Sequence, residues 1–210
     1  MSDKPRGYFK NVLVIDSETT GLCMGQESPV YNAKTGERHQ TVSWGIIVAD
    51  TATFTPVEKL YVEIKWNETS KQQRKANPEF GKRAEAVHGL TYEYLEANGK
   101  TEQEAVVEIG NLIMKHFGPN HVRTLGHNVA TFDVPFLRDL FERHDIPLDF
   151  GNRHVDTNSI GFATFGTFNS DDLFELIGFE HRENHNALTD AEQALETTRV
   201  IRTIFQQAIK

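Results

Sequence analysis

The run Val12–Ile15 most constrains what this chain can fold into, because four apolar, mostly β-branched residues are followed at once by two acidic ones. Such a run is typical of a buried β-strand. Side chains two residues apart lie on the same face of a strand, so Asp16 and Glu18 project together at its end. Two carboxylates this close repel one another once they are partly withdrawn from water. The pattern therefore predicts a positive partner for both, either a basic side chain or a divalent cation.

The length and composition are those of a globular protein. The 210 residues favour one domain, spanning 1–210, that is large enough to bury a sizeable core. A formal net charge of −8 argues against a protein that coats nucleic acid, but it is compatible with an enzyme whose site is rich in carboxylates. Cys23 is the single cysteine, no apolar stretch reaches transmembrane length, and the first residues lack the apolar region of a signal peptide. We expect a cytoplasmic protein without an internal disulfide.

Alternating apolar residues predict further strands over 41–50 and 59–67, joined by a turn-rich segment that contains Pro56. With the first strand they are expected to form an antiparallel meander. A short strand is predicted over 122–128. Three strands followed by alternating helix and strand indicate an α/β domain with a mixed sheet.

Helical periodicity predicts three long helices and one short helix. The long ones are expected over 101–118, where Thr101 and Glu104 form a capping box, over 130–146 and over 186–209. Ser170 is expected to cap the short helix, which Gly178 ends. Residues 154–166 show no clear period and are predicted to be irregular.

Two polar segments have no predicted regular structure. Residues 23–40 are longer than an ordinary connection and are expected to border a functional pocket or to form an exposed loop. Residues 71–91 are interpreted as a polar loop. It carries five basic residues: Lys71, Arg74, Lys75, Lys82 and Arg83. This charge is interpreted either as a solvated surface or as a track for a nucleic-acid backbone.

Two further places offer the same chemistry as the first strand. Asp133 stands near the start of a predicted helix, and His185 and Asp190 stand where the last helix begins. Ligand and catalytic residues of α/β folds gather where strands end, so we expect these groups to converge at one edge of the sheet. Oxygen ligands without sulfur favour Mg²⁺ or Mn²⁺, and two such ions about 4 Å apart suit phosphoryl displacement. A histidine that titrates near neutrality can take a proton from water. The set predicts metal-dependent hydrolysis of phosphodiesters.

Three segments carry a family resemblance: DSETTGL (16–22), HNVATFDVPFL (127–137) and HNALTD (185–190). They resemble, in the same order, the three motifs of the DEDDh (DnaQ-like) 3′–5′ exonucleases. Each motif alone is weak, whereas the three together span nearly the whole chain. The resemblance implies a ribonuclease H-like α/β fold, with a mixed five-stranded sheet whose first three strands are antiparallel and which helices flank.

The resemblance also implies roles for the acidic residues and the histidine. Asp16 is expected to bridge two metal ions, and Glu18 and Asp190 to help hold one of them. Asp133 is expected to act through a metal-bound water. His185 matches the histidine that defines the "h" subgroup and is expected to be the general base.

Five other positions match family residues that contact the substrate. The backbone of Thr19 and Thr20 and the side chain of Leu22 correspond to the grip on the terminal nucleotide. His88, in VHGLT, corresponds to a residue near the strand, although a surface histidine is an equal alternative. Asn128 matches the asparagine that precedes the second-motif aspartate, although its side chain can simply pin a turn.

The expected activity is removal of nucleotides from a 3′ end, with release of nucleoside 5′-monophosphates and two Mg²⁺ or Mn²⁺ ions as cofactors. DSETTGL is closer to proofreading enzymes than to oligoribonucleases, so single-stranded DNA is the preferred substrate. Three alternatives stay open: an RNA-trimming, oligoribonuclease-like enzyme, a proofreading subunit bound to a polymerase, and an inactive binding domain. No membrane contact is expected, and the oligomeric state is not predicted.

Two other patterns each have a functional and a structural interpretation. His127, His181 and His185 invite a zinc hypothesis, which is disfavoured because the glutamate of a zincin helix is missing. Phe162, Phe165 and Phe168 recur at every third position. Packing into the core is the favoured interpretation of this repeat, and stacking on bases is the alternative.

Overall fold

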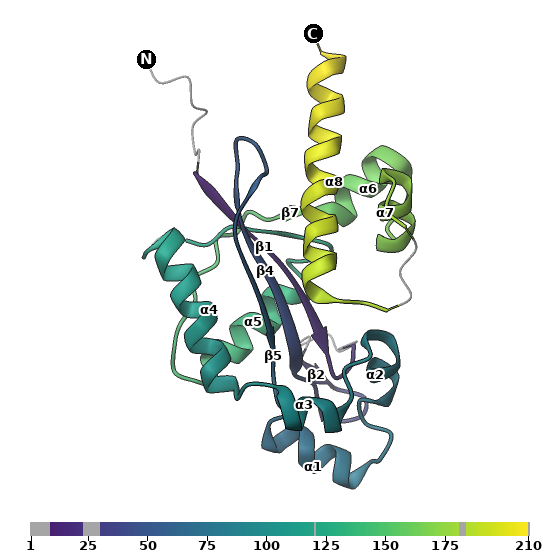
Figure 1. Ribbon diagram of the computed structural model, residues 1–210. Coiled ribbons are helices and arrows are strands. Elements are labelled where there is room, and N and C mark those ends of the chain that lie inside the picture. The colour runs from purple at the N-terminus through teal and green to yellow at the C-terminus, as the bar shows by residue number, and fades with distance from the viewer. Residues whose placement is uncertain (1–8, 23–29, 120, 181–183, 210) are drawn as a thin grey trace.

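The computed structural model describes residues 9–22, 30–119, 121–180 and 184–209. At its centre lies a five-stranded sheet with the order β5–β4–β1–β6–β7 (Figure 1). The strands are β1 (Asn11–Thr19), β4 (Thr41–Asp50), β5 (Pro56–Glu63), β6 (Thr124–Gly126) and β7 (Val155–Asp156). β1, β4 and β5 are antiparallel, whereas β6 is parallel to β1 and β7 to β6. The predicted mixed sheet, with three antiparallel strands first, is confirmed.

Helices cover both faces of the sheet (Figure 1). One face packs on α4 (Glu102–Phe117) and α5 (Asp133–Glu142), and the other packs on α7 (Ser170–Ile177) and α8 (Ala187–Ala208). Because successive side chains of β1 point to opposite faces, Leu13 and Ile15 join the first core and Val12 and Val14 join the second. The same alternation decides which helices the polar residues at the end of β1 meet.

The long helices follow the sequence pattern. α4 begins with the predicted capping box, in which Thr101 and Glu104 satisfy each other's backbone N–H groups. In α8 the apolar side is buried from its first residue as far as Ile201: Ala187, Ala191, Ala194, Leu195, Thr198 and Ile201. α8 then runs past the rest of the molecule to a projecting C-terminal end (Figure 1). No helix within the described ranges is long and apolar enough to cross a membrane.

The prediction of a loop over 71–91 is wrong. This region contains α1 (Glu68–Ala76) and α2 (Lys82–His88), and α3 (Tyr92–Asn98) follows. The side chains of Asn67 and Thr91 cap α1 and α3 by accepting backbone N–H groups. The three helices surround a small separate core built by Val42, Trp66, Phe80 and Leu95. Most of this core comes from residues outside the helices, so the helices themselves read as polar.

The expectation of irregular structure over 154–166 is also wrong, because β7 and α6 (Thr157–Phe165) lie there. The side chain of Asp156 caps α6, which buries only Thr157 and Gly161 and so lacks an apolar stripe. Phe162, Phe165 and Phe168 are exposed, so the favoured core packing is wrong for all three.

Two element boundaries need smaller corrections. Asn169, and not Ser170, caps α7, since the Asn169 side chain accepts the N–H of Asp172. β5 begins at Pro56, ahead of the predicted start, because an edge strand tolerates a residue that cannot donate to the ladder. Within 30–40 the chain forms a two-stranded hairpin of β2 (Tyr31–Asn32) and β3 (Glu37–Arg38).

Candidate active site

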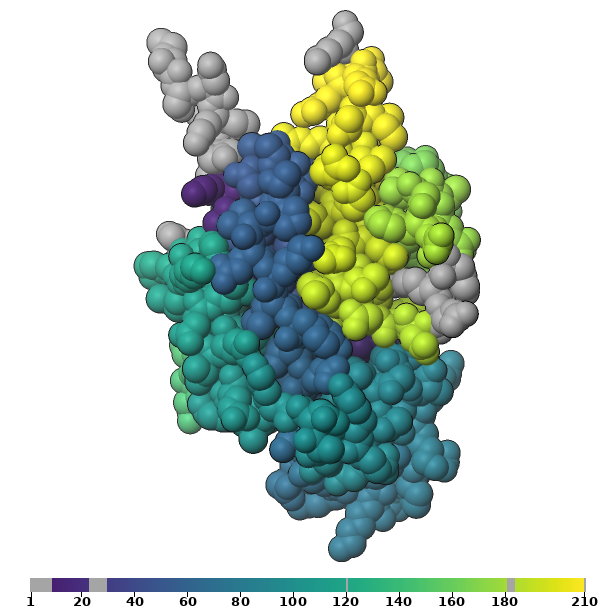
Figure 2. All heavy atoms as spheres, in the orientation of Figure 1, coloured from purple at the N-terminus to yellow at the C-terminus, as the bar shows by residue number. Residues whose placement is uncertain are grey.

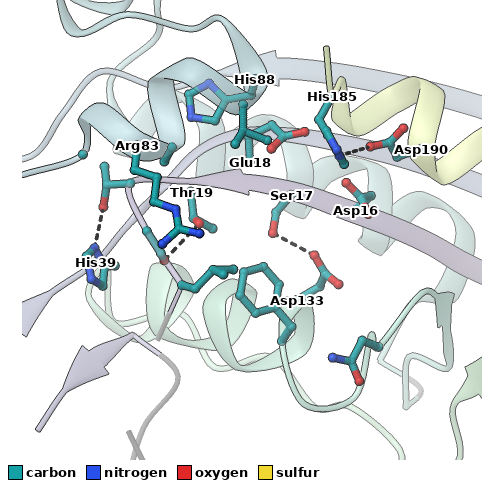
Figure 3. A pocket seen from close by; sticks show the side chains of 18 of the residues that line it. Asp16, Ser17, Glu18, Thr19, His39, Arg83, His88, Asp133, His185 and Asp190 are labelled. Atoms are coloured by element: carbon teal, nitrogen blue, oxygen red, sulfur yellow. Dashed lines mark hydrogen bonds and ion pairs between the residues drawn. The ribbon is translucent and has the colours of Figure 1, made fainter. Parts of the chain in front are cut away.

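The end of β1 distributes its polar side chains between the two helical layers. Asp16 and Glu18 share a face with Val14, toward α8, whereas Ser17 shares a face with Ile15, toward α5. Accordingly, the Ser17 hydroxyl donates to Asp133 Oδ1 at 2.7 Å, and Asp133 is the first residue of α5 (Figure 3). Strand alternation therefore brings carboxylates from two different helices to the same strand end.

The start of α8 supplies the histidine and the last carboxylate. Asn186 caps the helix by accepting the N–H groups of Leu188 and Thr189. With His185 just before the cap and Asp190 in the first turn, His185 Nδ1 lies 3.3 Å from Asp190 Oδ2 (Figure 3). Glu18, His185 and Asp190 each offer a ligand atom, and these atoms all lie within 4.8 Å of one another. The predicted convergence is thus present in the structure.

A glycine that the sequence reading missed allows α8 to approach the sheet. Gly45 of β4 pairs with Asp16 of β1. A Cβ atom at Gly45 would lie only 2.1 Å from the carbonyl oxygen of Ala187 and 2.2 Å from the nitrogen of Leu188. Side-chain atoms essentially never come this close to backbone. The start of α8 can therefore lie this near Asp16 because position 45 carries no side chain. A lone glycine within a strand pattern is the available signal for such a close approach.

Asp133 is almost completely buried. Burial raises its pKa from 3.8 to about 7, and the charge of Glu18 acts in the same direction, while the hydrogen bond from Ser17 opposes the shift. Asp133 Oδ2 is buried and accepts no hydrogen bond from any described residue. A buried carboxylate with an unused oxygen is costly without a positive partner.

These donors fit a divalent metal ion. They are carboxylate oxygens with one imidazole, a set that suits Mg²⁺ or Mn²⁺ and contains no thiolate. The unused Asp133 oxygen on the α5 side and the acidic cluster on the α8 side lie on opposite sides of the same strand end (Figure 3). The alternative of a zinc site with His127 and His181 gains no support, since the His127 ring contacts Thr157 and the Phe168 carbonyl. His181 lies outside the described residues.

All five predicted catalytic residues line one cavity of about 820 Å³: Asp16, Glu18, Asp133, His185 and Asp190. In Figure 2 a small purple area belonging to the β1 segment reaches the surface between the start of α8 and the α1–α3 region. The backbone N–H of His185 donates to the Val87 carbonyl at 3.2 Å, which links the start of α8 to α2 across this opening.

The predicted substrate-binding residues line the same cavity. They are Thr19, Thr20, Leu22, His88 and Asn128. Leu22 is exposed. Asn128 adopts a positive φ of 60°, and its side-chain oxygen accepts the Thr131 hydroxyl at 3.1 Å. Its part in a turn is therefore visible beside its place in the cavity.

His88 is buried, so the alternative of a surface histidine is wrong. Its Nδ1 accepts the N–H of Leu90 at 3.0 Å, and the ring proton of neutral His88 is therefore on Nε2. Burial lowers the pKa of His88, and a contact with the backbone of Thr19 partly opposes the shift. The ring is accordingly neutral at pH 7.

Residues that the sequence reading did not assign form the far wall of the cavity. His39 stacks on Phe80 with ring centroids 5.2 Å apart and planes 3° apart. Gly21 makes room for His39, because a Cβ at Gly21 would lie 2.5 Å from the imidazole. Asn32 and Glu37 add polar groups from the β2–β3 hairpin. The expectation that 23–40 borders the pocket therefore holds for its described part.

The basic residues of 71–83 do not act as one surface. Lys71 is paired with Glu96, and Arg74 with Glu85. Lys82 lies 3.6 Å from Glu79, in a looser pair. Of the five, Arg83 alone lines the cavity, where its side chain points toward the end of β1 (Figure 3). Lys75 is exposed, so a track for a nucleic-acid backbone outside the cavity stays a prediction, and inside the cavity Arg83 is the basic residue of the five that it could use.

The fold and the site together define the class of protein. A mixed sheet with three antiparallel strands first, and four carboxylates with a histidine gathered at the end of its central strand, are the features of a DEDDh-type 3′–5′ exonuclease. The chain belongs to the exonuclease family of the RNase T type, whose model matches residues 13–198. Recognition of the family from three short motifs is confirmed. No curated protein sequence matches the chain.

Solved structures share the fold at low sequence identity. One is E. coli exonuclease I in complex with a dT13 oligonucleotide, which is 16% identical to this chain with a TM-score of 0.70. The match covers 96% of this chain and 43% of the exonuclease I chain. A second is the zinc-bound form of the E. coli exonuclease I complex with single-stranded DNA, which is 18% identical with a TM-score of 0.68. That match covers 92% of this chain and 40% of the exonuclease I chain. This chain thus spans less than half of exonuclease I.

A third structure is matched along nearly its whole length. The nuclease domain of 3′hExo, a DEDDh family member bound to rAMP, is 12% identical with a TM-score of 0.64. The match covers 94% of each chain. The shared fold therefore extends over nearly all of both chains.

Proposed function

We propose that this chain hydrolyses single-stranded DNA from the 3′ end and releases nucleoside 5′-monophosphates. The observation that carries the proposal is the meeting of Asp16, Glu18, Asp133, His185 and Asp190 in one cavity. The oligonucleotides held by structures of the same fold support a single-stranded substrate.

Two divalent ions, Mg²⁺ or Mn²⁺, are the proposed cofactors. Asp16 would hold both, Glu18 and Asp190 would help hold one, and Asp133 would act through a water. When bound, the ions supply positive charge that stabilises the attacking and leaving oxygens of an in-line displacement. They would also offset the cost of burying Asp133, which raises its pKa, and the smaller effect of the Glu18 charge on the same group.

His185 is the proposed general base. Its Nδ1 faces the Asp190 carboxylate, which can only accept, so the proton of the neutral ring belongs on Nδ1. The basic lone pair is then on Nε2, where it can take a proton from an attacking water. The backbone bond from His185 to Val87 holds the ring at the opening of the cavity.

The terminal nucleotide is proposed to occupy the part of the cavity beyond the carboxylates. There the backbone of Thr19 and Thr20 offers polar contacts, and Leu22 offers an apolar one. His88, neutral and buried beside Thr19, would support the floor of this pocket. Asn128 would contact the strand from the α5 side.

RNA trimming is the second candidate function. Its support is the rAMP bound to the nuclease domain of 3′hExo, which shares the fold along nearly its full length. The carboxylate centre would serve either sugar, because it acts on the phosphate. The same geometry is compatible with a proofreading subunit and with an inactive binding domain. Measurement of the reaction separates an active enzyme from the inactive domain.

The test is the reaction on a 5′-labelled oligodeoxynucleotide and its RNA counterpart, with Mg²⁺, Mn²⁺ or EDTA. We expect a ladder that shortens from the 3′ end only with metal, faster on DNA, and absent in Asp16→Ala. His185→Ala should lower turnover about 10²–10⁴-fold while strand binding is largely kept. His121→Ala is the matched control, because His121 Nδ1 also contacts a carboxylate, Asp149 Oδ2 at 2.6 Å, outside the cavity.

Each result decides a separate point. An oligonucleotide that stays intact with every metal would contradict the exonuclease activity and favour a binding module. If the RNA is shortened faster than the DNA, RNA is the preferred substrate. Equal turnover in His185→Ala and His121→Ala would remove His185 from the role of general base.

A further inference from the structure

Two phenylalanines form a stacked pair on the surface. The rings of Phe162 and Phe168 have centroids 4.2 Å apart and planes 5° apart. Yet 53% of Phe162 and 56% of Phe168 is exposed, so the pair leaves much aromatic surface in water. Aromatic side chains gain most of their stabilising energy from burial, and this pair gives up much of that gain in the isolated chain.

The pair is fixed to the rim of the cavity by hydrogen bonds. The carbonyl of Phe168 lies 3.0 Å from Nε2 of His127 and accepts the Asn158 side chain at 3.1 Å. His127 lines the cavity, and so does Ser170, two residues after Phe168. Asp156, which caps α6, also accepts the backbone N–H of Asn128 at 2.9 Å. The aromatic pair therefore adjoins the site through several connections.

The strand pairing places this rim opposite the nucleotide pocket. β6 pairs in parallel with β1 at Val14 and Leu125, so His127, two residues after Leu125, is level with Asp16. Thr19 and Thr20 lie three and four residues further along, about 10–13 Å away at the rise of a strand. A 3′-terminal nucleotide at Thr19 and Thr20, with its phosphate at the carboxylates, leaves the rest of the strand to depart at the His127 end.

The charges of the cavity favour contact with bases over contact with phosphates. Among the described residues that line it, Arg83 is the single lysine or arginine, against six carboxylates: Asp16, Glu18, Glu37, Glu79, Asp133 and Asp190. α7, next to the aromatic pair, carries Asp171 and Asp172 in its first turn. A strand that leaves past this rim meets few positive groups, whereas every base has a face that stacks on an aromatic ring.

We propose that Phe162 and Phe168 are a stacking platform for bases upstream of the scissile phosphate. This proposal rests on the proposed exonuclease function, and it names where the single strand is held outside the cavity. The ligand is an unpaired nucleic-acid strand, and stacking makes the contact tolerant of base sequence. The platform would raise affinity for longer strands while leaving the reaction at the terminal nucleotide unchanged.

The test compares the wild type with a Phe162→Leu/Phe168→Leu double variant, which keeps apolar bulk but removes the ring faces. The substrates are the p-nitrophenyl ester of thymidine 5′-monophosphate, which has no upstream base, and dT2, dT4 and dT8. We expect KM for dT8 to rise about tenfold with kcat nearly unchanged. The ester should react equally with both proteins. Fluorescence of 2-aminopurine, placed at each position in turn, should show quenching at upstream positions in the wild type alone.

Phe205→Ala is the matched control, because Phe205 is also a phenylalanine with 56% exposure but lies in the last turn of the projecting α8. It should leave KM unchanged for every length. If the wild type hydrolyses dT8 and the double variant has the same KM for it, the platform is overturned while the exonuclease function stands. A wild type that hydrolyses neither ester nor oligonucleotide would overturn the exonuclease function, and the platform with it. A change in oligomeric state, with KM unaltered, would show instead that the pair contacts a second copy.

Discussion

At the scale of single residues, the burial of Asp133 makes its protonation depend on folding. Its pKa is raised by burial to about 7 in the metal-free protein, so the folded chain binds a proton between pH 4 and 7 that the unfolded chain releases. Over this window the unfolded state binds fewer protons, so the contribution of Asp133 to the free energy of unfolding falls as pH rises, by up to about 1.4 kcal/mol per pH unit.

Asp133→Asn should remove this dependence because the amide has the same shape and does not titrate. The measurement is urea unfolding of both proteins in EDTA at pH 4, 5, 6, 7 and 8. The difference in unfolding free energy, wild type minus variant, should decline from pH 4 to 7 and then level off. A constant difference would show that Asp133 is already ionised in the fold without metal.

At the scale of elements, the contact between β4 and the start of α8 decides the geometry of the site. Gly45→Ala would place a methyl group 2.1 Å from the Ala187 carbonyl, so α8 must shift and carry His185 and Asp190 with it. Overpacking should cost about 1–3 kcal/mol of stability. A displacement of this kind should also lower turnover by about 10²-fold, measured on the single-stranded oligonucleotide.

Gly110→Ala is the control for this experiment. Gly110 lies within α4, and its nearest neighbour to an added Cβ is Phe141 at 3.6 Å, an ordinary contact. This substitution should stabilise the helix by about 0.5–1 kcal/mol and leave turnover unchanged. Full activity in Gly45→Ala would show that the start of α8 is not held by that contact.

The elements also show what the sequence could predict. α4, α5 and α8 were predictable because each carries its own apolar stripe, and β1 because both of its faces are buried. α1 and α6 lack such a stripe: α1 buries only Ser70, and α6 only Thr157 and Gly161. Their positions depend on caps and on partners distant in sequence, which periodicity does not register.

The candidate site was predictable to the extent that it lies in motifs. The five carboxylate and histidine positions sit at element ends whose convergence follows from the topology of an α/β sheet. His39, Phe80 and Gly45 were missed, because they reach the site only through tertiary packing. Ser17 was visible between two motif residues, but its bond to Asp133 required knowing which helix faces each side of β1.

At the scale of the whole molecule, we expect the concentration of carboxylates to make the stability of the fold depend on bound metal. The chain has a formal net charge of −8, and four of its acidic groups meet in one cavity. Mg²⁺ or Mn²⁺ at about 100 times its dissociation constant should stabilise the fold by about 2.7 kcal/mol. For a chain of this length that raises Tm by about 5–10 °C.

Differential scanning calorimetry in Mg²⁺ and in EDTA, at equal ionic strength, measures this shift. The increase should be lost in Asp16→Asn, which removes the proposed bridging carboxylate. An equal increase in Tm with NaCl alone would assign the increase to general screening of charge.

A single domain over 1–210 and a cytoplasmic location stay predictions.

The hairpin of β2 and β3 has a consequence for which bonds can be cut. The Gln73 side chain bonds both the backbone N–H and the carbonyl of Arg38 at 2.6 Å, and the Arg38 side chain pairs with Asp139. With His39 against Phe80, this fixes a wall beyond the nucleotide pocket. On the proposed function, a strand that enters from the His127 end would meet that wall after the terminal nucleotide, so only a free end could present its last phosphodiester bond. The wall would then limit the product to one nucleotide, and we expect a closed circle of single-stranded DNA to be left uncut.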